Sequence, residues 1–471
     1  MCPQRCAMPT PRLIIIGLDC MEPSLVFEQW REDLPNLSRL MAQGIYGPME
    51  SSIPAITVPA WSCMMTGRDP GELGIYGFRN RRDRDYHSMA ISDGRAVKFP
   101  RLWDILGEAG WSVAVLSVPG TSPPYAVNGS LVSCFLTPST EVPFTHPPEL
   151  GDQIKAWMPD FMMDVPNFRS DEKDRILDNL YRLCDQRFTL AEKLIDQDQP
   201  DFLMLVDMGV DRLHHAFWKP MDPRHPQYEP DSPFATAIHD YYVHVDKRVG
   251  ELLTHCDDET AVLVVSDHGA QPLMGGICIN EWLISQGYLT LKEAPDQVMP
   301  LDQAAVDWGQ TQVWGAGGYY ARIFFNVKGR EPQGNVAMAD YDTLRQELTE
   351  KLKTLTDPSG NPLPIKVFKP QDIYQKVRGR APDLIVYFDD LAWRSVGSVG
   401  LHSLYTVEND TGPDDANHAP FGLMIFHDPA QPQNGRELEG AQLYDVLPTL
   451  LNRYGLTPPD GLRGKVWGQN R

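Results

Sequence analysis

The chain has 471 residues, more than the roughly 250–300 that one hydrophobic core usually supports, so we expect one large domain with an insertion, or two domains. Its net charge of −21, from 42 basic and 63 acidic residues, argues against binding to a nucleic-acid duplex. No apolar stretch approaches the ~20 residues of a membrane span, so we expect no membrane partner. A small phosphorylated substrate is compatible with this charge where metals and arginines offset it.

Two features of the sequence bear on the location of the protein, the N-terminus and the cysteines. Residues 1–11 contain no apolar run, so we expect no signal peptide. The eight cysteines are scattered and none forms a Cys-x-x-Cys pair. Reduced thiols in a cytoplasmic protein are the simplest interpretation. The oligomeric state is not indicated by any pattern.

Strands and helices are predicted to alternate along most of the chain. The predicted strands are 12–19, 112–118, 201–207, 261–266 and 423–426. The predicted helices are 34–43, 101–109, 170–196, 234–253, 281–286 and 444–454. This alternation predicts an α/β fold with a doubly wound, mainly parallel sheet and helices on both of its faces.

Two stretches interrupt the alternation. Residues 137–167 are rich in proline and predict a long loop with a short helix. Residues 289–400 have a mixed pattern, with predicted strands at 320–326 and 384–388 around a helix at 340–353. We therefore expect a catalytic core formed by residues 12–288 and 401–471, and a smaller, cap-like α+β subdomain formed by residues 289–400.

Aspartates and histidines flank the predicted strands. The residues concerned are Asp19, Asp207, Asp211, His215, Asp267, His268 and His418. Because the carboxyl ends of strands in an open α/β sheet meet at one edge, these side chains are expected to converge. Carboxylates and imidazoles gathered at such an edge predict a hydrolytic metal site, with enough ligands for two ions.

Thr57 lies before Val58-Pro59 and a helix-forming stretch, which makes it a good N-cap. Capping is the commoner role of such a threonine. A hydroxyl at a helix N-terminus also lies in positive potential, which suits an attacking alkoxide and a phosphoryl oxygen. Since the two roles are compatible, Thr57 is also a candidate nucleophile.

In their order, these motifs resemble those of the type I phosphodiesterases/nucleotide pyrophosphatases of the alkaline phosphatase superfamily, over almost the full length. Thr57-x-Pro59 followed by Thr66-Gly67 is similar to the family's nucleophile segment. The family's metal motifs are matched in order by Asp211-x-x-x-His215, Ser266-Asp267-His268-Gly269 and His418. Each motif is weak alone, and their common order makes the resemblance specific.

The resemblance implies two divalent cations, usually zinc in this superfamily, with manganese or magnesium as alternatives. The first ion would be held by Asp19, Asp267, His268 and the Thr57 oxygen. The second ion would be held by Asp211, His215 and His418. Thr57 would attack phosphorus in line, and water activated at the second metal would release the phospho-threonine.

Each ligand also has a structural alternative, since Asp19 and Ser266-Asp267-His268-Gly269 could simply form turns. Asp211 and His215, at i and i+4, share one helical face, whereas His214 points elsewhere and is expected to be a neighbour. Asp207 is expected to be structural. His402 and His427 lie near His418, which is selected by its position before the last strand.

One departure from the family concerns an asparagine that helps to stabilise the phosphoryl oxygen. Phe78 occupies the aligned position, and Asn80 lies two residues later. Nearby Arg81 and Arg82 belong to a run of arginines, for which a solvated loop is the commoner interpretation. We hypothesise instead that Asn80, Arg81 and Arg82 contact substrate, with the arginines gripping a second phosphate or the leaving group.

Rival functions follow from the same core. A sulfatase would need Cys or Ser in place of Thr57, which disfavours that function. A phosphomonoesterase or a metal-dependent mutase is compatible with two metals, although a mutase normally carries a serine nucleophile. A catalytically inactive scaffold would have lost ligands, whereas all six candidates are present.

Overall fold

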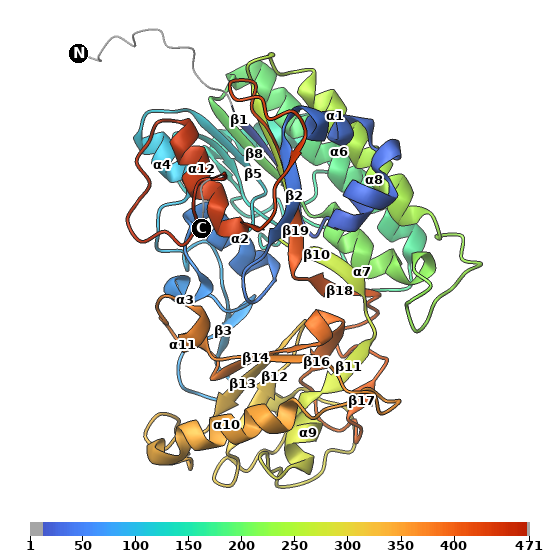
Figure 1. The fold of residues 1–471 in the computed structure, drawn as a ribbon, viewed down its shortest axis with the longest axis vertical. Coiled ribbons are helices and arrows are strands. Elements are labelled where there is room, and N and C mark those ends of the chain that lie inside the picture. The colour runs from blue at the N-terminus through green and yellow to red at the C-terminus, as the bar shows by residue number, and fades with distance from the viewer. Residues whose placement is uncertain (1–12, 469–471) are drawn as a thin grey trace.

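The computed structural model describes residues 13–468, which form a larger and a smaller lobe (Figure 1). Two predictions fall outside the described residues. They are the absence of a signal peptide in residues 1–11 and the start of a strand at Arg12. The larger lobe is built on a ten-stranded sheet in the order β20-β2-β19-β9-β1-β8-β5-β6-β7, with β21 also paired to β2. Its strands are β1 (Leu13–Leu18), β2 (Ile45–Glu50), β5 (Val113–Leu116), β6 (Gly129–Val132), β7 (Thr145–His146), β8 (Phe202–Asp207), β9 (Ala261–Val265), β19 (Phe421–His427), β20 (Arg436–Glu437) and β21 (Ala441–Gln442).

The centre of this sheet is parallel. Strands β9, β1, β8, β5 and β6 run in one direction, while β19 pairs antiparallel with both β9 and β2. The six residues of β1 are all buried, as expected for an apolar strand covered on both faces.

Helices cover both faces of the sheet (Figure 1). One face carries α1 (Pro35–Gln43), α6 (Lys173–Asp198), α7 (Gly209–Met221) and α8 (Ala237–Leu253). The other carries α2 (Thr57–Thr66), α4 (Leu102–Glu108) and α12 (Val446–Arg453). Two further helices, α3 (Pro70–Leu73) and α5 (Pro148–Trp157), lie in connecting segments. The predicted doubly wound α/β fold is therefore confirmed. Within residues 13–468, every helix is too short or too polar to serve as a membrane span.

The smaller lobe contains a seven-stranded sheet in the order β12-β13-β15-β16-β11-β17, with β14 paired to β15. Its elements are β11 (Gly275–Cys278), α9 (Ile279–Ser285), β12 (Val313–Ala316), β13 (Ala321–Phe325), α10 (Tyr341–Leu352), β14 (Ile365–Phe368), α11 (Pro370–Ile373), β15 (Leu384–Phe388), β16 (Trp393–Val396) and β17 (Tyr405–Thr406). This sheet begins before residue 289 and ends after residue 400, and the division of the chain at those residues stays a prediction.

Two small sheets complete the fold. In one, β10 (Gly269–Pro272) pairs antiparallel with β18 (Ala416–Ala419). In the other, β3 (Arg79–Arg81) pairs antiparallel with β4 (Met89–Ile91).

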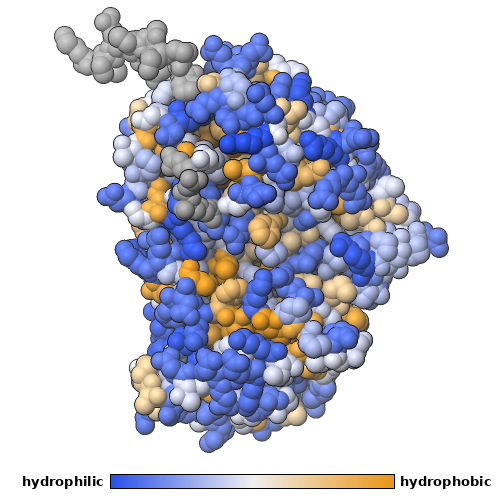
Figure 2. Space-filling view, viewed as in Figure 1, coloured by the Kyte–Doolittle hydropathy of each residue, from blue (hydrophilic) through white to orange (hydrophobic). Residues whose placement is uncertain are grey.

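The two lobes meet beside Thr57. Ala55 and Ile56 of the larger lobe belong to one apolar cluster with Tyr320 and Tyr387 of the smaller lobe. The Ala55 N–H donates to the Tyr387 hydroxyl at 2.8 Å. Figure 2 shows apolar residues gathered at the level of this junction, with hydrophilic residues over most of the surrounding surface. The segment that leads into α2 is therefore held by both lobes.

Candidate active site

The register of the central strands brings distant aspartates to one edge of the sheet. Leu18 pairs with Asp207, and Gly17 pairs with Val265, so β1, β8 and β9 end at the same level. Asp19 follows β1 directly and Asp267 lies two residues after β9. Both carboxylates therefore lie at the ligand-binding edge of the parallel sheet.

Two other elements deliver histidines to the same edge. Helix α7 begins two residues after β8 and carries Asp211 and His215 on one face. The pairing of β18 with β10 sets His418 opposite Ala270, two residues after His268. As a result, the rings of His268 and His418 stack with centroids 3.8 Å apart.

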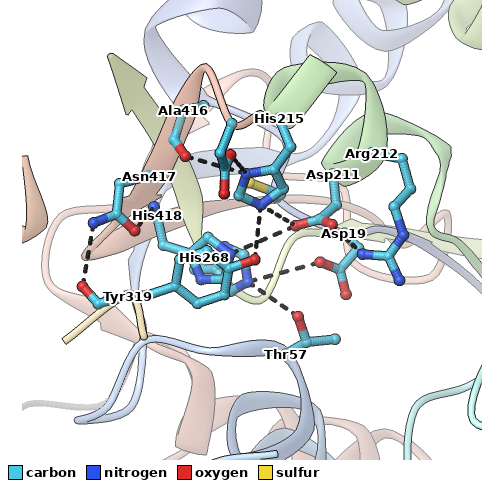
Figure 3. A network of polar contacts seen from close by, with 12 residues as sticks. Asp19, Thr57, Asp211, Arg212, His215, His268, Tyr319, Ala416, Asn417 and His418 are labelled. Atoms are coloured by element: carbon cyan, nitrogen blue, oxygen red, sulfur yellow. Dashed lines mark hydrogen bonds and ion pairs between the residues drawn. The ribbon is translucent and has the colours of Figure 1, made fainter. Parts of the chain in front are cut away.

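The first group of ligand atoms comes from Asp19, Asp267 and His268. Figure 3 shows Asp19 and His268 of this group. Their candidate ligand atoms lie within 4.8 Å of one another, and all three residues are buried. The Nε2 atom of His268 is 3.7 Å from Asp19 Oδ1 and 3.4 Å from Asp267 Oδ2. The structure thus brings together the first predicted ligand triad.

The second group comes from Asp211, His215 and His418, whose candidate ligand atoms also lie within 4.8 Å of one another. Asp211 Oδ1 is 3.4 Å from His215 Nε2 and 3.6 Å from His418 Nε2. This is the second predicted triad. A third grouping, which sequence reasoning missed, joins Cys20 to His268 and His418.

Thr57 lies next to the first group. Its hydroxyl oxygen is 3.5 Å from His268 Nε2 (Figure 3). Thr57 is the first residue of α2, and the N-cap position belongs to Ile56, which makes no side-chain capping bond. The expectation that Thr57 is the N-cap is therefore wrong by one residue, because the helix begins at Thr57 itself. Its hydroxyl faces the histidine and lies at the positive end of the helix dipole.

The three histidines present the same nitrogen to the centre. Each Nδ1 contacts an oxygen: His215 that of Asp414 at 2.6 Å, His268 that of Gly269 at 3.2 Å and His418 that of Ala55 at 3.0 Å. When Nδ1 carries the proton and donates it to such an oxygen, the lone pair of Nε2 is free to bind a cation. Metal-ligating histidines in proteins are usually oriented in this manner.

The ligand atoms that point to the centre of the two groups, here called the inward atoms, are suited to binding a cation. Asp19 Oδ1, Asp211 Oδ1, Asp267 Oδ2 and His418 Nε2 are buried, and none has a hydrogen-bond partner within residues 13–468. Burying an unpaired carboxylate is costly unless it is paired or coordinates a metal. Oxygen and imidazole nitrogen donors in groups of three, with room for a further ligand, suit catalytic zinc and similar divalent ions.

Burial is the largest cause of the pKa shifts of Asp19, Asp267, His268 and His418. Burial raises the pKa of Asp19 and of Asp267 well above the ordinary value, with a further contribution from a neighbouring carboxylate, Asp211 for Asp19 and Asp19 for Asp267. Burial lowers the pKa of His268 to about 4 and that of His418 well below its usual value, which favours the neutral imidazoles that a cation could bind. Bound cations would relieve the repulsion among the carboxylates.

Asp19 is positioned by a tryptophan, since Trp61 Nε1 donates to Asp19 Oδ2 at 2.6 Å. Trp61 lies one helical turn after Thr57 in α2. A Cβ at Gly17 would approach the Trp61 ring to 2.6 Å, so the glycine in β1 lets this helix come close to the strand. One indole thus links α2 to the Asp19 carboxylate of the first ligand group.

We expect Trp61→Phe to weaken metal affinity about 10–100-fold, because it frees the carboxylate that the indole orients. Equilibrium titration of the metal-free protein with Zn²⁺ measures this. Trp103→Phe is the matched control, since Trp103 is also buried and its Nε1 donates to Tyr125 Oη at 2.7 Å, away from the ligand groups. Equal affinity in the two variants would contradict a positioning role for Trp61.

Three further residues of the site were not predicted from the sequence. Arg212 Nη1 donates to Asp211 Oδ2 at 2.6 Å, Asp414 binds His215, and the Tyr319 ring stacks on His418 at 3.9 Å. Asp414 and Tyr319 lie in irregular segments whose position depends on the tertiary fold. Only Arg212, one residue after a predicted ligand, could have been suspected from its place in the chain.

The two expected neighbours of the triads have other partners. Asp207 accepts hydrogen bonds from the Gly209 N–H at 3.1 Å and the Tyr241 hydroxyl at 3.3 Å, and burial raises its pKa to about 6. The His214 ring contacts the Tyr242 hydroxyl at 3.0 Å through Nε2. Neither residue belongs to a ligand group.

The predicted substrate-binding residues Asn80, Arg81 and Arg82 do not belong to the ligand groups. Asn80 and Arg81 lie in strand β3, and Arg82 lies in the segment between β3 and β4. The Asn80 amide accepts from the Tyr76 N–H and donates to the Gly77 carbonyl and the Ser92 hydroxyl. Arg81 is buried against Glu331 at 3.1 Å, and Arg82 is exposed. A contact of these residues with substrate stays a prediction.

Comparisons with known proteins agree with this geometry. The profile of the family described as type I phosphodiesterase / nucleotide pyrophosphatase matches residues 13–414. No curated protein matches the chain in sequence. The family implies dependence on divalent metal ions and action on small phosphorylated substrates, in keeping with the two ligand groups.

Solved structures share the fold at low sequence identity. Phosphonoacetate hydrolase from Sinorhizobium meliloti 1021 is 17% identical, with a TM-score of 0.60 over 93% of this chain and 95% of that one. Human ectonucleotide pyrophosphatase/phosphodiesterase 5 is 14% identical, with a TM-score of 0.56 over 96% and 97%. A mutant of the alkaline phosphatase PafA is 14% identical, with a TM-score of 0.64 over 98% and 99%. The chain therefore belongs to the type I phosphodiesterase / nucleotide pyrophosphatase family, has the fold of the alkaline phosphatase superfamily and is a phosphoryl-transfer hydrolase of phosphoric esters.

Proposed function

We propose that the chain is a phosphodiesterase/nucleotide pyrophosphatase that acts through a phospho-threonine intermediate at a binuclear metal site. The proposal is carried by the gathering of Thr57 with two ligand triads, four of whose six inward atoms, Asp19 Oδ1, Asp211 Oδ1, Asp267 Oδ2 and His418 Nε2, lack hydrogen-bond partners within residues 13–468. We assign one ion to Asp19, Asp267, His268 and the Thr57 oxygen. We assign the other to Asp211, His215 and His418. Zinc is the proposed metal, with manganese or magnesium as alternatives.

In the proposed reaction the Thr57 oxygen attacks phosphorus, and the alcohol or phosphate leaving group departs from the opposite side. Water then attacks the phospho-threonine, breaks the bond between phosphorus and the threonine oxygen and releases the product. Divalent cations bound at the two triads would stabilise negative charge on the attacking and leaving oxygens. The start of α2 contributes the positive end of its dipole to the same oxygens.

Reaction class is tested with bis-p-nitrophenyl phosphate, p-nitrophenyl phosphate and p-nitrophenyl sulfate, followed by nucleotide sugars and dinucleotides. We expect kcat/KM to be highest for the diester, by about tenfold or more, and sulfate turnover to be negligible. A preference for the monoester would replace the proposal with a phosphomonoesterase. No hydrolysis of any ester by a metal-loaded sample would indicate an inactive scaffold.

A cytoplasmic location is part of the proposal, and cell fractionation tests it. Buried free thiols are found at Cys20, Cys63, Cys134, Cys184 and Cys278. Reduced cysteines of this kind are usual in the cytoplasm.

A further inference from the structure

A cavity of about 370 Å³ lies beside the Thr57 centre. Its wall includes Ile56, which precedes Thr57, and Tyr319, whose hydroxyl is 3.2 Å from His215 Nε2. Arg212, which donates to a carboxylate of the second triad, also lines it. The cavity therefore adjoins both the nucleophile and the second ligand group. A substrate with its phosphorus at Thr57 would place its remaining part here.

The charged residues that line this cavity are all arginines. They are Arg79, Arg169, Arg212, Arg322 and Arg394. Among the described residues of the wall there is no aspartate, glutamate or lysine. Five guanidinium groups line one cavity in a chain with a net charge of −21, although Arg169, Arg212 and Arg394 pair with carboxylates outside the wall.

Three of these arginines are held in place by rings and by carboxylates outside the wall. The Arg212 guanidinium lies 4.4 Å from the centroid of the Phe168 ring, and that of Arg169 lies 4.7 Å from the same ring. Arg169 and Arg394 share one carboxylate, Asp414, at 3.1 and 3.4 Å. A rigid guanidinium loses little entropy when it binds an anion.

The positive charge of the cavity is only partly neutralised. Arg169, Arg212 and Arg394 form ion pairs with carboxylates, whereas Arg79 and Arg322 form none with a carboxylate of residues 13–468. Arg322 Nη1 instead donates to the Arg79 backbone carbonyl, which ties the two lobes together at the cavity. Arg394 is 4% exposed, and its Nε has no hydrogen-bond partner within the described part of the chain. A buried donor without a partner is costly unless a ligand satisfies it.

We propose that this cavity binds a second oxyanion of the substrate, a carboxylate or a phosphate, carried by the part of the molecule remote from the phosphorus that is attacked. The inference rests on the proposed function, because it takes Thr57 as the position of that phosphorus. Guanidinium forks match the geometry of carboxylate and phosphate oxygens and bind them with two parallel hydrogen bonds. The residues predicted to grip an anion are Arg81 and Arg82, whereas Arg79, two residues before Arg81, lines the cavity.

The test uses aryl phosphate esters, as methyl diesters or as monoesters according to the preference found above. The aryl ring carries a 3-carboxylate, a 3-phosphonomethyl group or a neutral 3-carbamoyl group of similar shape to the carboxylate. The double variant Arg79→Gln/Arg322→Gln removes the two unpaired charges. Arg95→Gln/Lys247→Gln is the control, since it removes two positive charges from side chains that are 77% and 71% exposed.

We expect the unmodified protein to prefer at least one anionic ester over the carbamoyl ester by about tenfold or more in kcat/KM, the gain of one charge-assisted bond. The double variant should reduce this ratio to near one, while the control keeps it. The carboxylate and phosphonate arms then tell which oxyanion is preferred. A ratio near one in the unmodified protein, or an equal ratio in the double variant and the control, would overturn the inference.

A binding measurement separates this inference from the proposed function. Calorimetric titration of Thr57→Ala with the carboxylate and carbamoyl esters reports the cavity without turnover, and the same preference is expected in Kd. If the double variant unfolds, Arg79→Gln alone serves, because Arg79 is exposed. Turnover by Thr57→Ala would remove the threonine intermediate and leave the test of the cavity standing. Equal Kd values for the carbamoyl, carboxylate and phosphonomethyl esters, each titrated in this way, would overturn the inference alone.

Discussion

Thr57→Ala is expected to lower kcat by at least about 10³-fold, because it removes the oxygen that forms the covalent intermediate. Metal content and Tm should stay close to those of the unmodified protein, since both ligand triads are intact. Thr57→Ser retains a hydroxyl and should recover a measurable part of the activity. Steady-state hydrolysis of bis-p-nitrophenyl phosphate, with metal analysis of the same samples, checks all three expectations.

The control for this variant is Ser62→Ala in the same buried helix. The Ser62 hydroxyl donates to the Val58 carbonyl at 2.7 Å and belongs to neither ligand group. Its loss should change kcat by less than about tenfold, because it removes one intrahelical hydrogen bond. If Thr57→Ala retained the activity of Ser62→Ala, Thr57 could not be the nucleophile. Trapping of a phosphorylated peptide that contains Thr57 would give independent support.

His215→Ala is expected to reduce the bound metal from about two ions per chain to about one, and to lower kcat by about 10²-fold or more, because a triad loses a ligand. Its Nε2 lies 3.4 Å from Asp211 Oδ1, and its Nδ1 is held by Asp414. Mass spectrometric metal analysis after dialysis, together with activity, measures the effect. Less than one transition metal in the carefully prepared unmodified protein would contradict the binuclear site.

The adjacent residue supplies a matched control. His214 is as buried as His215, but its Nε2 contacts Tyr242 and it belongs to neither ligand group. His214→Ala should therefore lose stability of similar size through the cavity it creates, yet keep both metals. Loss of metal from both variants alike would show that local unfolding, and not ligation, is being measured.

Much of the fold was predictable because its signals are local. A buried parallel strand reads as a short apolar run, and β1, β8 and β9 are such runs. Asp19 follows β1 directly, Asp207 is the last residue of β8, and Asp267 lies two residues after β9. The spacing of Asp211 and His215 follows from the helical period. The antiparallel direction of β19 and β2 was not predictable, because a buried strand has the same composition in either direction.

The residues on the substrate-binding side of the site could not be predicted from local sequence signals. A run of charges indicates a basic segment, but not which arginine turns inward. In the structure Arg79 lines the cavity, Arg81 pairs with Glu331 and Arg82 is exposed. The other four arginines of the cavity come from separate segments of both lobes, with no spacing that relates them.

The sequence by itself determined the family, the α/β class and the candidates Thr57, Asp19, Asp211, His215, Asp267, His268 and His418. It could do so because each lies next to a periodic element, and the order of elements along the chain is enough to bring strand ends together. Only the tertiary structure decided what holds and surrounds them, such as Trp61 on Asp19, Asp414 on His215 and the arginines of the cavity. Those contacts depend on how lobes and loops pack in three dimensions, and side-chain packing leaves no period in the chain.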